Sequence, residues 1–329
     1  MKLINSFKSN IFNLKPKEFD SLALRLFRVQ AKENDIYRRY LSALGVVPER
    51  VKCVEDIPFL PIRFFKEHKV ITGNFQEEAV FRSSGTTDLH TSNHYIESLG
   101  YYKQVTEQIF KDFYGDIRQY CIIGLLPSYL ERKNASLVHM VQHYISLSSS
   151  PDSGFYLNDY ESLARKLKKL HKKGQKVWLV GVTFALLEFA ERYGMPLDNT
   201  ILVETGGMKG RGRELTRPEL HELLKNKFPG VKIHSEYGMT ELHSQAYMQK
   251  NEWFQAPEWM KVYIRDINDP FAVMPHGKSG PINIIDLANV YSCAFIETQD
   301  LGVLDNEGRF RVLGRMDNTE QRGCNLMLY

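Results

Sequence analysis

The sequence of 329 residues has few cysteines and no long apolar run. The four cysteines, Cys53, Cys121, Cys293 and Cys324, are far apart, so their spacing predicts neither a metal site nor a disulfide framework. No stretch approaches the roughly 18 apolar residues that a membrane span requires, and residues 1–20 lack the apolar core of a signal peptide. We therefore expect a cytoplasmic protein with reduced thiols and no membrane span.

Strong charge is also missing from the sequence. The 43 Lys and Arg residues nearly balance the 39 Asp and Glu residues, which gives a formal net charge of +4. This surplus is too small to indicate nucleic acid as a partner. Hydrophobic residues make up 43% and charged residues 25%, as in an ordinary globular protein. The length suffices for one large domain or two ordinary domains.

Apolar runs alternate with amphipathic segments through the middle of the chain. Helical patterns occupy residues 160–174, 183–194 with Thr183 as cap, and 217–228, and strand-like runs occupy residues 176–182, 200–207 and 231–241. Residues 17–46 have the spacing of two further helices, and Pro58 and Pro61 predict an extended segment. This alternation predicts an α/β fold with a mainly parallel sheet and helices on both faces.

The pattern changes after residue 270. Short strand-like runs at residues 280–287, 291–300, 301–308 and 309–314 predict a small antiparallel sheet, with Asp305–Gly308 as a hairpin turn. We therefore divide the chain into an α/β core (1–270), a β-rich subdomain of that core (271–316) and a C-terminal tail (317–329) that carries Cys324.

The stretch RSSGTTD at residues 82–88 is rich in hydroxyl groups. Its glycine permits a sharp bend, and hydroxyls and backbone N–H groups together can surround phosphate oxygens. No lysine follows as in a P-loop, and a plain surface turn is an equally good interpretation. The candidate phosphate ligands are Ser83, Ser84, Gly85, Thr86 and Thr87.

A second stretch, HSEYGMTEL at residues 234–242, follows an apolar strand. At the carboxyl end of a parallel strand, Tyr237, Gly238, Thr240 and Glu241 can reach a ligand in the crevice there. A tyrosine can stack on a base, and a carboxylate beside phosphates suits Mg²⁺. Alternatively, Glu241 only favours the N-terminal dipole of a helix.

Two further stretches hold candidate ligands of a nucleotide. In ETQDLGVL, Asp300 is predicted at a strand end, where it can accept hydrogen bonds from ribose hydroxyls or simply occupy a hairpin turn. In VETGGMKGRGREL, Gly206 and Gly207 allow the backbone to lie against a flat ring, and Lys209 and Arg211 can face phosphate charge. The alternative for this second stretch is a solvated basic loop.

The order of these motifs is more informative than any one of them. SSGTT, TGG, YGMTE, TQDLG and GRxD follow one another as in the adenylate-forming superfamily, which the sequence resembles over residues 80–323. More narrowly, the sequence resembles the LuxE-like acyl-protein synthetases. The motifs that carry this closer resemblance are IPFLPIRFFK, FRSSGTTD, TGGMKG, YGMTEL and the terminal RGCNLM.

The resemblance implies a fold, an activity and a set of site residues. The fold is that of the large domain of adenylate-forming enzymes, with the usual small C-terminal domain absent or reduced to a tail. The reaction is attack of a carboxylate on the α-phosphate of ATP, which gives acyl-AMP and pyrophosphate with Mg²⁺ as cofactor. The implied roles are pyrophosphate binding by residues 83–87, adenine binding by Gly206, Gly207 and Tyr237 beside Gly238, α-phosphate contact by Thr240, Mg²⁺ binding by Glu241, and ribose binding by Asp300 with support from Arg315.

Two features distinguish the narrower family. The lysine that the small domain normally supplies has no counterpart here, and we hypothesise that Lys209 or Arg211 provides its charge. In LuxE-like proteins the acyl group moves to a cysteine near the C-terminus, which Cys324 matches; the alternative is a tail cysteine without a role. The neighbouring Arg322 favours the thiolate form. The remaining cysteines, Cys53, Cys121 and Cys293, are expected in the core.

The acid-binding pocket is the least determined part of the sequence. Gly181, Thr183 and Phe184, at the strand and helix near residue 183, are candidates for its wall, although each also suits ordinary packing. His94 and His139 are weaker candidates, since a lone histidine is usually structural.

The sequence therefore predicts an AMP-forming ligase that activates a fatty or related carboxylic acid. The acyl group would pass to Cys324 and then to a partner protein such as an acyl-protein reductase. The alternatives are an acyl-CoA ligase without its C-terminal domain and a non-catalytic protein that binds a nucleotide or acyl-AMP.

Overall fold

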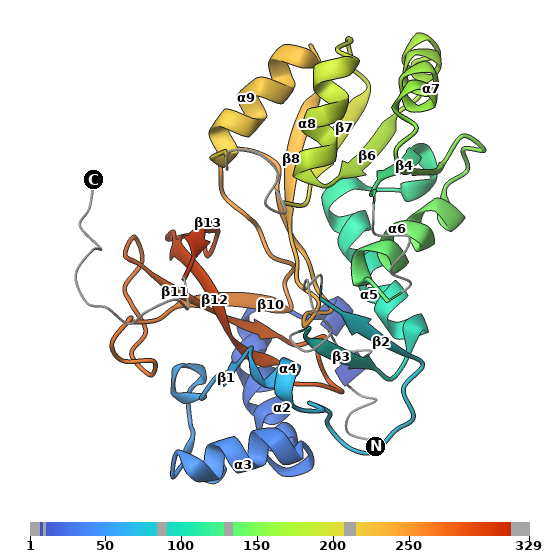
Figure 1. Ribbon diagram of the computed structural model, residues 1–329. Coiled ribbons are helices and arrows are strands. Elements are labelled where there is room, and N and C mark those ends of the chain that lie inside the picture. The colour runs from blue at the N-terminus through green and yellow to red at the C-terminus, as the bar shows by residue number, and fades with distance from the viewer. Residues whose placement is uncertain (1–6, 9–10, 84–90, 128–133, 207–214, 317–329) are drawn as a thin grey trace.

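A computed structural model describes residues 7–8, 11–83, 91–127, 134–206 and 215–316 of the protein (Figure 1). Three sheets organise this part of the chain. One has six strands in the order β5-β4-β6-β7-β8-β9, one has five strands built on the order β1-β12-β11-β10 with β13 also paired to β12, and the third is the hairpin β2-β3. The described part of the chain holds no helix long and apolar enough to cross a membrane.

The six-stranded sheet is parallel except for its last strand. Its strands are β4 (Cys121–Leu125), β5 (Gly154–Tyr156), β6 (Val177–Gly181), β7 (Thr200–Glu204), β8 (Lys232–Tyr237) and β9 (Ala246–Met248). β4 and β6 are buried along their whole length, as expected of parallel strands covered on both faces. The predicted parallel sheet is confirmed, and the antiparallel β9 follows because the loop after β8 turns directly back.

Helices cover both faces of this sheet. They are α5 (Leu99–Tyr114), α6 (Ser136–Leu147), α7 (Tyr160–Lys172), α8 (Thr183–Arg192) and α9 (Arg217–Lys227). Rings of Phe110 in α5 and Tyr144 in α6 pack against Trp178 of β6. On the α8 side, Phe189 contacts Tyr160 of α7 and Phe228 just after α9.

The caps of two helices explain where they begin. α9 starts with a capping box, in which Thr216 and Glu219 satisfy each other's backbone N–H groups. The predicted cap of α8 is wrong by one residue, because Val182 holds the N-cap position and Thr183 is already helical. The hydroxyl of Thr183 instead reaches Glu204 across the strand end at 3.5 Å.

The five-stranded sheet is antiparallel except where β1 joins it. Its strands are β1 (Leu60–Pro61), β10 (Met260–Ile264), β11 (Ser279–Asp286), β12 (Phe295–Leu304) and β13 (Phe310–Arg315). β1 runs parallel to β12, with Leu60 opposite Ile296. The sheet therefore extends beyond residues 271–316, the range predicted for the β-rich subdomain, because β1 and β10 precede it in the chain.

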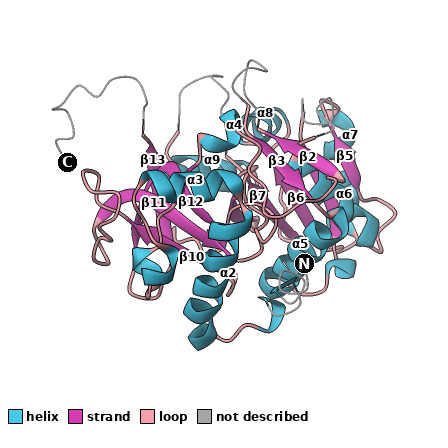
Figure 2. Ribbon diagram, turned by 90° about the horizontal axis from the view of Figure 1, so that it is seen from below, coloured by secondary structure: helices cyan, strands magenta, loops and turns pink. Residues whose placement is uncertain are grey.

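The N-terminal helices pack on this second sheet (Figure 2). α2 (Phe19–Glu33) buries residues at steps of three and four, and Asn34 caps α3 (Asp35–Ala43) by accepting a hydrogen bond from the N–H of Tyr37. Phe27 and Tyr37 contact the ring of Phe295 in β12 at centroid distances of 5.9 and 6.1 Å. The two predicted helices in residues 17–46 are therefore confirmed.

The remaining elements join the two sheets. α4 (Phe64–Glu67) follows β1 directly, so the segment predicted as extended also contains one helical turn. β2 (Ala79–Arg82) and β3 (Asn93–Ile96) form the hairpin whose connection contains the hydroxyl-rich stretch.

The cysteines divide by environment. Cys121 and Cys293 are buried, as predicted, and Cys53 is exposed, so the prediction for Cys53 is wrong. The thiol of Cys53 donates to Asp56 at 2.9 Å, on a polar 3-10 turn that offers no apolar cover. Cys324 lies outside the described residues.

Candidate active site

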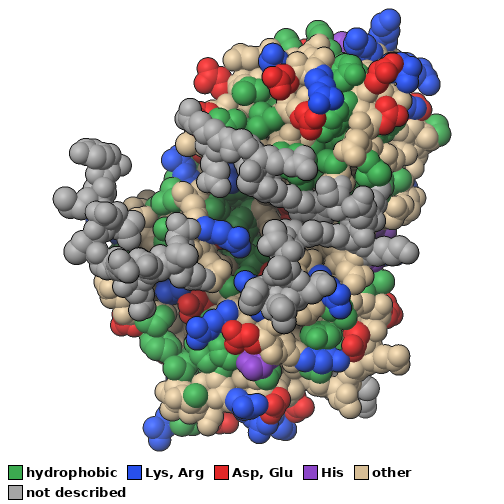
Figure 3. Space-filling model, in the orientation of Figure 1, with side chains coloured by type: hydrophobic (Ala, Val, Ile, Leu, Met, Phe, Trp, Pro, Cys, Tyr) green, Lys and Arg blue, Asp and Glu red, His purple; other side chains and the backbone are tan. Residues whose placement is uncertain are grey.

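A cavity of about 560 Å³ lies between the two large sheets. Figure 3 shows the molecular surface hollowed in this region, between the parts formed by the six-stranded and five-stranded sheets. The carboxyl ends of parallel strands form one wall, the usual place for a ligand in such a sheet. Of the predicted residues, those that line the cavity are Ser83, Gly238, Thr240, Glu241, Asp300 and Arg315.

Ser83 stands where the β2-β3 hairpin opens toward the cavity. Its backbone N–H donates to the carbonyl of Ser92 at 3.1 Å, and its hydroxyl accepts from the N–H of Ser92 at 2.9 Å. These two bonds close the base of the connecting loop. Ser84, Gly85, Thr86 and Thr87 lie outside the described residues.

Two buried side chains hold the YGMTE loop through hydrogen bonds to its backbone. Nδ1 of His94 lies 2.8 Å from the carbonyl oxygen of Thr240, and Nδ2 of Asn289 donates to the carbonyl of Glu241 at 2.8 Å. Because a carbonyl only accepts, Nδ1 of His94 carries the proton. Burial and, secondly, the neighbouring His243 lower the pKa of His94 to about 3, so the ring is neutral.

His94 therefore lies under the loop, and it is not among the residues that line the cavity. Its other nitrogen, Nε2, is buried without a hydrogen-bond partner in the described part of the chain. Asn289 also accepts from the backbone N–H of His243 at 3.1 Å. No local sequence signal points to Asn289, because it acts through the packing of the β11–β12 connection against the loop.

Glu241 projects into the cavity from the same loop although its side chain is almost fully buried. Burial raises the pKa of Glu241, and a hydrogen bond from Ser92 and the charges of Arg315 and Lys66 offset only part of this effect. A cation next to this carboxyl would favour its ionised form.

The surroundings of Glu241 fit one kind of metal site. Among the described residues no three His, Cys, Asp or Glu side chains are placed to share a metal ion. Mg²⁺ bound with a nucleotide needs only one or two carboxylates, since phosphate oxygens and water complete its shell. Glu241 beside Thr240 therefore fits Mg²⁺ in this form and no all-protein metal cage.

Asp300 is held between both sheets. The hydroxyl of Tyr237 donates to its Oδ2 at 2.8 Å, and Nε of Arg315 lies 3.4 Å from its Oδ1. The predicted position of Asp300 at a strand end is wrong: β12 continues to Leu304, and Asp300 pairs with Arg315 inside the ladder.

Tyr237 is 8% exposed and its ring packs against Phe254 and Phe310. The residues that line the cavity do not include it. Its contact with the site among the described residues is the hydroxyl group that holds Asp300, and stacking of its ring on adenine stays a prediction.

The glycine loop after β7 is fixed at its start. Gly206 has a φ of +73°, which favours glycine, and its N–H donates to Glu204 at 2.8 Å. Burial raises the pKa of Glu204, yet His221, the charge of Arg217 and further hydrogen bonds outweigh it and lower the pKa overall. Gly207, Lys209 and Arg211 lie outside the described residues.

The residues predicted for the acid-binding pocket are not on the cavity wall. Gly181 packs against Leu186, such that a Cβ at Gly181 would lie 2.8 Å from that side chain. Thr183 and Phe184 are buried at the start of α8. His139 contacts Phe81 at 5.1 Å between ring centroids. These residues lie in a packed strand–helix junction, and their assignment to an acid-binding pocket stays a prediction.

Other residues that the sequence did not indicate line the cavity. Lys66 of α4 and Arg82 of β2 add positive charge to it, and Glu236 and Gln245 stand on either side of the YGMTE loop. The only sequence signal for Glu236 is its place one residue before Tyr237, which strand alternation turns to the opposite face.

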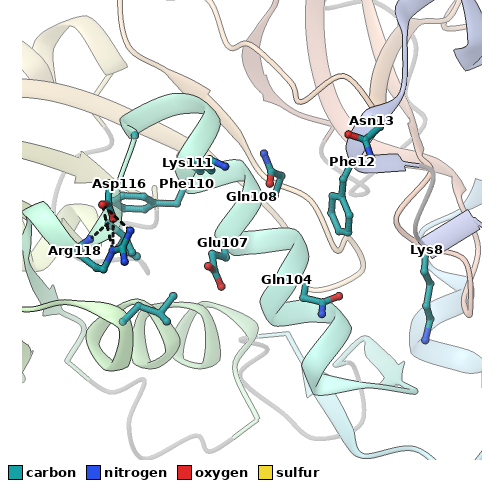
Figure 4. Close-up of a pocket in the computed structure, with 13 residues that line it drawn as sticks. Lys8, Phe12, Asn13, Gln104, Glu107, Gln108, Phe110, Lys111, Asp116 and Arg118 are labelled. Atoms are coloured by element: carbon teal, nitrogen blue, oxygen red, sulfur yellow. Dashed lines mark hydrogen bonds and ion pairs between the residues drawn. The ribbon is translucent and has the colours of Figure 1, made fainter.

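A larger hollow of about 1160 Å³ lies elsewhere, along α5 beside Lys8, Phe12 and the Asp116–Arg118 turn (Figure 4). None of the predicted site residues within the described ranges lines it. The motif residues, and not cavity size, therefore define the candidate active site.

The fold is that of the large domain of adenylate-forming ligases. The structure is similar to 2-hydroxyisobutyryl-CoA ligase in an open conformation with 2-HIB-AMP and CoA, with a TM-score of 0.68 and 13% identity, covering 91% of this chain and 69% of that one. It is also similar to ATP-bound MatB from Rhodopseudomonas palustris, with a TM-score of 0.54 and 17% identity over 72% of this chain and 48% of that one.

The sequence comparison assigns the chain to a narrower family. The model of the family "Acyl-protein synthetase, LuxE" matches residues 9–329, so the chain belongs to the LuxE family of ligases. A long-chain-fatty-acid–luciferin-component ligase from Vibrio harveyi is 24% identical over 324 residues, covering 90% of this chain and 83% of that protein.

Proposed function

We propose that this LuxE-family protein uses ATP to activate a fatty or related carboxylic acid as acyl-AMP and then transfers the acyl group to its own Cys324. One observation carries this proposal. Ser83, Thr240, Glu241, Asp300 and Arg315, which come from four separate segments, line one cavity between the two sheets.

In the first step a carboxylate oxygen of the acid attacks the α-phosphorus of ATP. A bond from that oxygen to phosphorus forms, and the bond to the bridging oxygen of pyrophosphate breaks. The acid is already ionised at neutral pH, so no general base is needed. Asp300, fixed by Tyr237, would accept hydrogen bonds from the ribose, and Thr240 would donate to the α-phosphate.

Negative charge builds up around the phosphorus, and positive groups must offset it. Glu241 would hold Mg²⁺, which would neutralise phosphate charge when bound. Lys209 and Arg211 remain candidates for a positive charge beside the phosphates. Lys66, Arg82 and Arg315 are the cations that line the described cavity.

In the second step the thiolate of Cys324 attacks the acyl carbonyl carbon. A thioester bond forms, the bond to the phosphate oxygen breaks, and AMP leaves. The described chain reaches the cavity at Arg315, and the N–H of Met316 donates to the carbonyl of Gln299 at 2.8 Å. Cys324 is eight residues further on. Eight residues span at most roughly 26–29 Å, enough to reach across the cavity.

The relatives support the same proposal. The protein from Vibrio harveyi is a ligase of long-chain fatty acids, and the two similar structures contain an acyl-AMP or ATP. By analogy, the final acceptor would be a partner protein such as an acyl-protein reductase.

One experiment tests the proposal against its alternatives. The protein is incubated with ATP, Mg²⁺ and radiolabelled fatty acids, and label on the protein is measured before and after hydroxylamine. We expect hydroxylamine-sensitive label that Cys324→Ser abolishes and Cys53→Ser retains, since Cys53 is the exposed thiol among the described residues. Acyl-CoA formed only with added CoA would favour a CoA ligase. The absence of pyrophosphate exchange with every acid would indicate a binding protein.

A further inference from the structure

A polar pair lines the cavity beside the YGMTE loop. Glu236 of β8 and Gln245, directly before β9, pack over the same glycine: a Cβ placed on Gly238 would lie 2.3 Å from Oε1 of Glu236 and 3.3 Å from Cγ of Gln245. Both side chains line the cavity. The facing wall is formed by α5 and the start of α6, through Tyr102, Ala135, Ser136, Leu137 and Met140.

The hydrogen bonds of Gln245 within the described residues leave its amide oxygen unpaired. Its Nε2 donates to the carbonyl of His243 at 3.0 Å, which fixes the orientation of the amide. Its Oε1 is then an acceptor, and this oxygen is buried without a partner in the described part of the chain. The whole residue is only 4% exposed. Buried acceptors rarely remain unpaired, because the loss of hydration is not compensated.

The carboxyl group of Glu236 is similarly open. Neither a hydrogen bond nor an ion pair joins it to another residue within the described ranges. The neighbouring rings on its face of the sheet, Tyr102, Tyr144 and Tyr247, are themselves buried. Burial and, secondly, the charge of Glu204 raise the pKa of Glu236 to about 8, so at neutral pH this carboxyl mostly carries its proton.

Both side chains lie next to Gly238, and a protonated carboxyl together with an unpaired amide oxygen is complementary to a hydroxyl group. A hydroxyl can donate to the amide oxygen and accept from the carboxyl O–H at the same time. A plain methylene chain in this position would leave both protein groups unpaired. An ammonium group would satisfy the amide oxygen but would instead favour an ionised Glu236.

We propose that the carboxylic acid activated by this protein carries a hydroxyl group, which Glu236 and Gln245 bind at the cavity wall beside Gly238. This inference rests on the proposed acid activation and names the class of acid. It adds no chemical step, since the hydroxyl is bound and does not react. Glu236 and Gln245 would then set the specificity of the reaction.

The test compares acids that differ only in one group. ATP–pyrophosphate exchange is measured with decanoic acid, with 2-, 3- and 10-hydroxydecanoic acids and with 3-aminodecanoic acid. A site built to hydrogen-bond a hydroxyl rejects an analogue that lacks it. We expect kcat/KM for at least one hydroxy acid to exceed that for decanoic acid roughly tenfold or more.

Variants separate recognition from folding, because the ratio between two acids does not depend on the fraction of active protein. Glu236→Leu and Gln245→Leu should each bring the ratio of hydroxy to plain acid close to one. Glu236→Gln retains a donor and an acceptor and should keep part of the preference. Gln299→Leu, a matched change on β12 of the same cavity, should leave the ratio unaltered.

Each of the other possible outcomes contradicts one specific part of the proposal. Exchange with decanoic acid as good as with every hydroxy acid would overturn the hydroxyl-binding role and leave acid activation intact. A preference for 3-aminodecanoic acid would replace the hydroxyl by an ammonium group. A preference that both leucine variants keep would exclude the pair as its cause. No exchange with any acid would refute acid activation itself.

Discussion

The two large sheets contribute to the cavity in different ways. The six-stranded sheet supplies Thr240 and Glu241 from a loop beyond a strand end, and buried side chains from elsewhere hold that loop. The five-stranded sheet supplies Asp300 and Arg315 from inside paired strands, where the ladder fixes them. We infer that the loop side stabilises the charge that builds up at phosphorus during the reaction. The strand side would bind the nucleoside, whose charge does not change.

The largest effect is expected from a substitution on the loop side. Glu241→Gln keeps the size of the side chain but removes its charge, so transition-state stabilisation by Mg²⁺ should be lost. We expect kcat/KM for pyrophosphate exchange to fall at least about 100-fold, equivalent to about 3 kcal/mol. Glu191→Gln, on the exposed side of α8, serves as the control. A fall of less than threefold would show that Glu241 does not act at this step.

A smaller effect is expected on the strand side. Asp300→Asn removes a charged acceptor for the ribose, and such hydrogen bonds are worth roughly 1.5–3 kcal/mol. KM for ATP should therefore rise about 10- to 100-fold with kcat nearly unchanged. Tyr237→Phe, which removes only the hydroxyl that holds Asp300, should raise KM less. A large loss of kcat with normal KM would contradict the division between the two sides.

The pH dependence of stability tests the environment of Glu236, beside the YGMTE loop. Folded Glu236 has a pKa of about 8 against an ordinary 4.5, so the folded protein holds this proton more tightly than the unfolded chain. Its contribution to stability is therefore full below pH 4.5 and declines as the pH rises to about 8. Glu236→Gln should gain stability relative to the parent over that window.

Melting temperatures at pH 5, 6.5 and 8 measure this change. The difference between variant and parent should grow in favour of Glu236→Gln by on the order of 2 °C or more across the range. Glu191→Gln again serves as a control, whose difference should stay constant. A constant difference for Glu236→Gln as well would mean that Glu236 is solvated as in the unfolded chain.

The smallest effect is expected from a substitution of Arg315, on the strand side. Arg315 pairs with Asp300, but its side chain is 76% exposed. Exposed ion pairs contribute roughly 0–1 kcal/mol, so Arg315→Gln should change KM for ATP by no more than about fivefold. A loss equal to that of Asp300→Asn would show that Arg315 contacts the nucleotide directly.

Periodicity and motif order predicted the layered fold and the strand–loop placement of Thr240 and Glu241. They failed at Asp300, because pairing with β11 and β13 on both sides carries β12 through the Asp-Leu-Gly stretch that resembles a turn. They also missed Asn289, Glu236 and Gln245. Glu236 and Gln245 line the cavity and Asn289 holds the YGMTE loop through tertiary packing, which no motif of the sequence indicates.

The pairing of β1 with β12 has a consequence for how the protein is made. All strands of the six-stranded sheet lie between Cys121 and Met248, so this sheet can assemble while the ribosome is still producing the rest. β1 must wait for β12, and Phe27 and Tyr37 wait for Phe295. The apolar faces of α2 and α3 therefore stay uncovered through most of synthesis, and we expect the strand side of the cavity to form last.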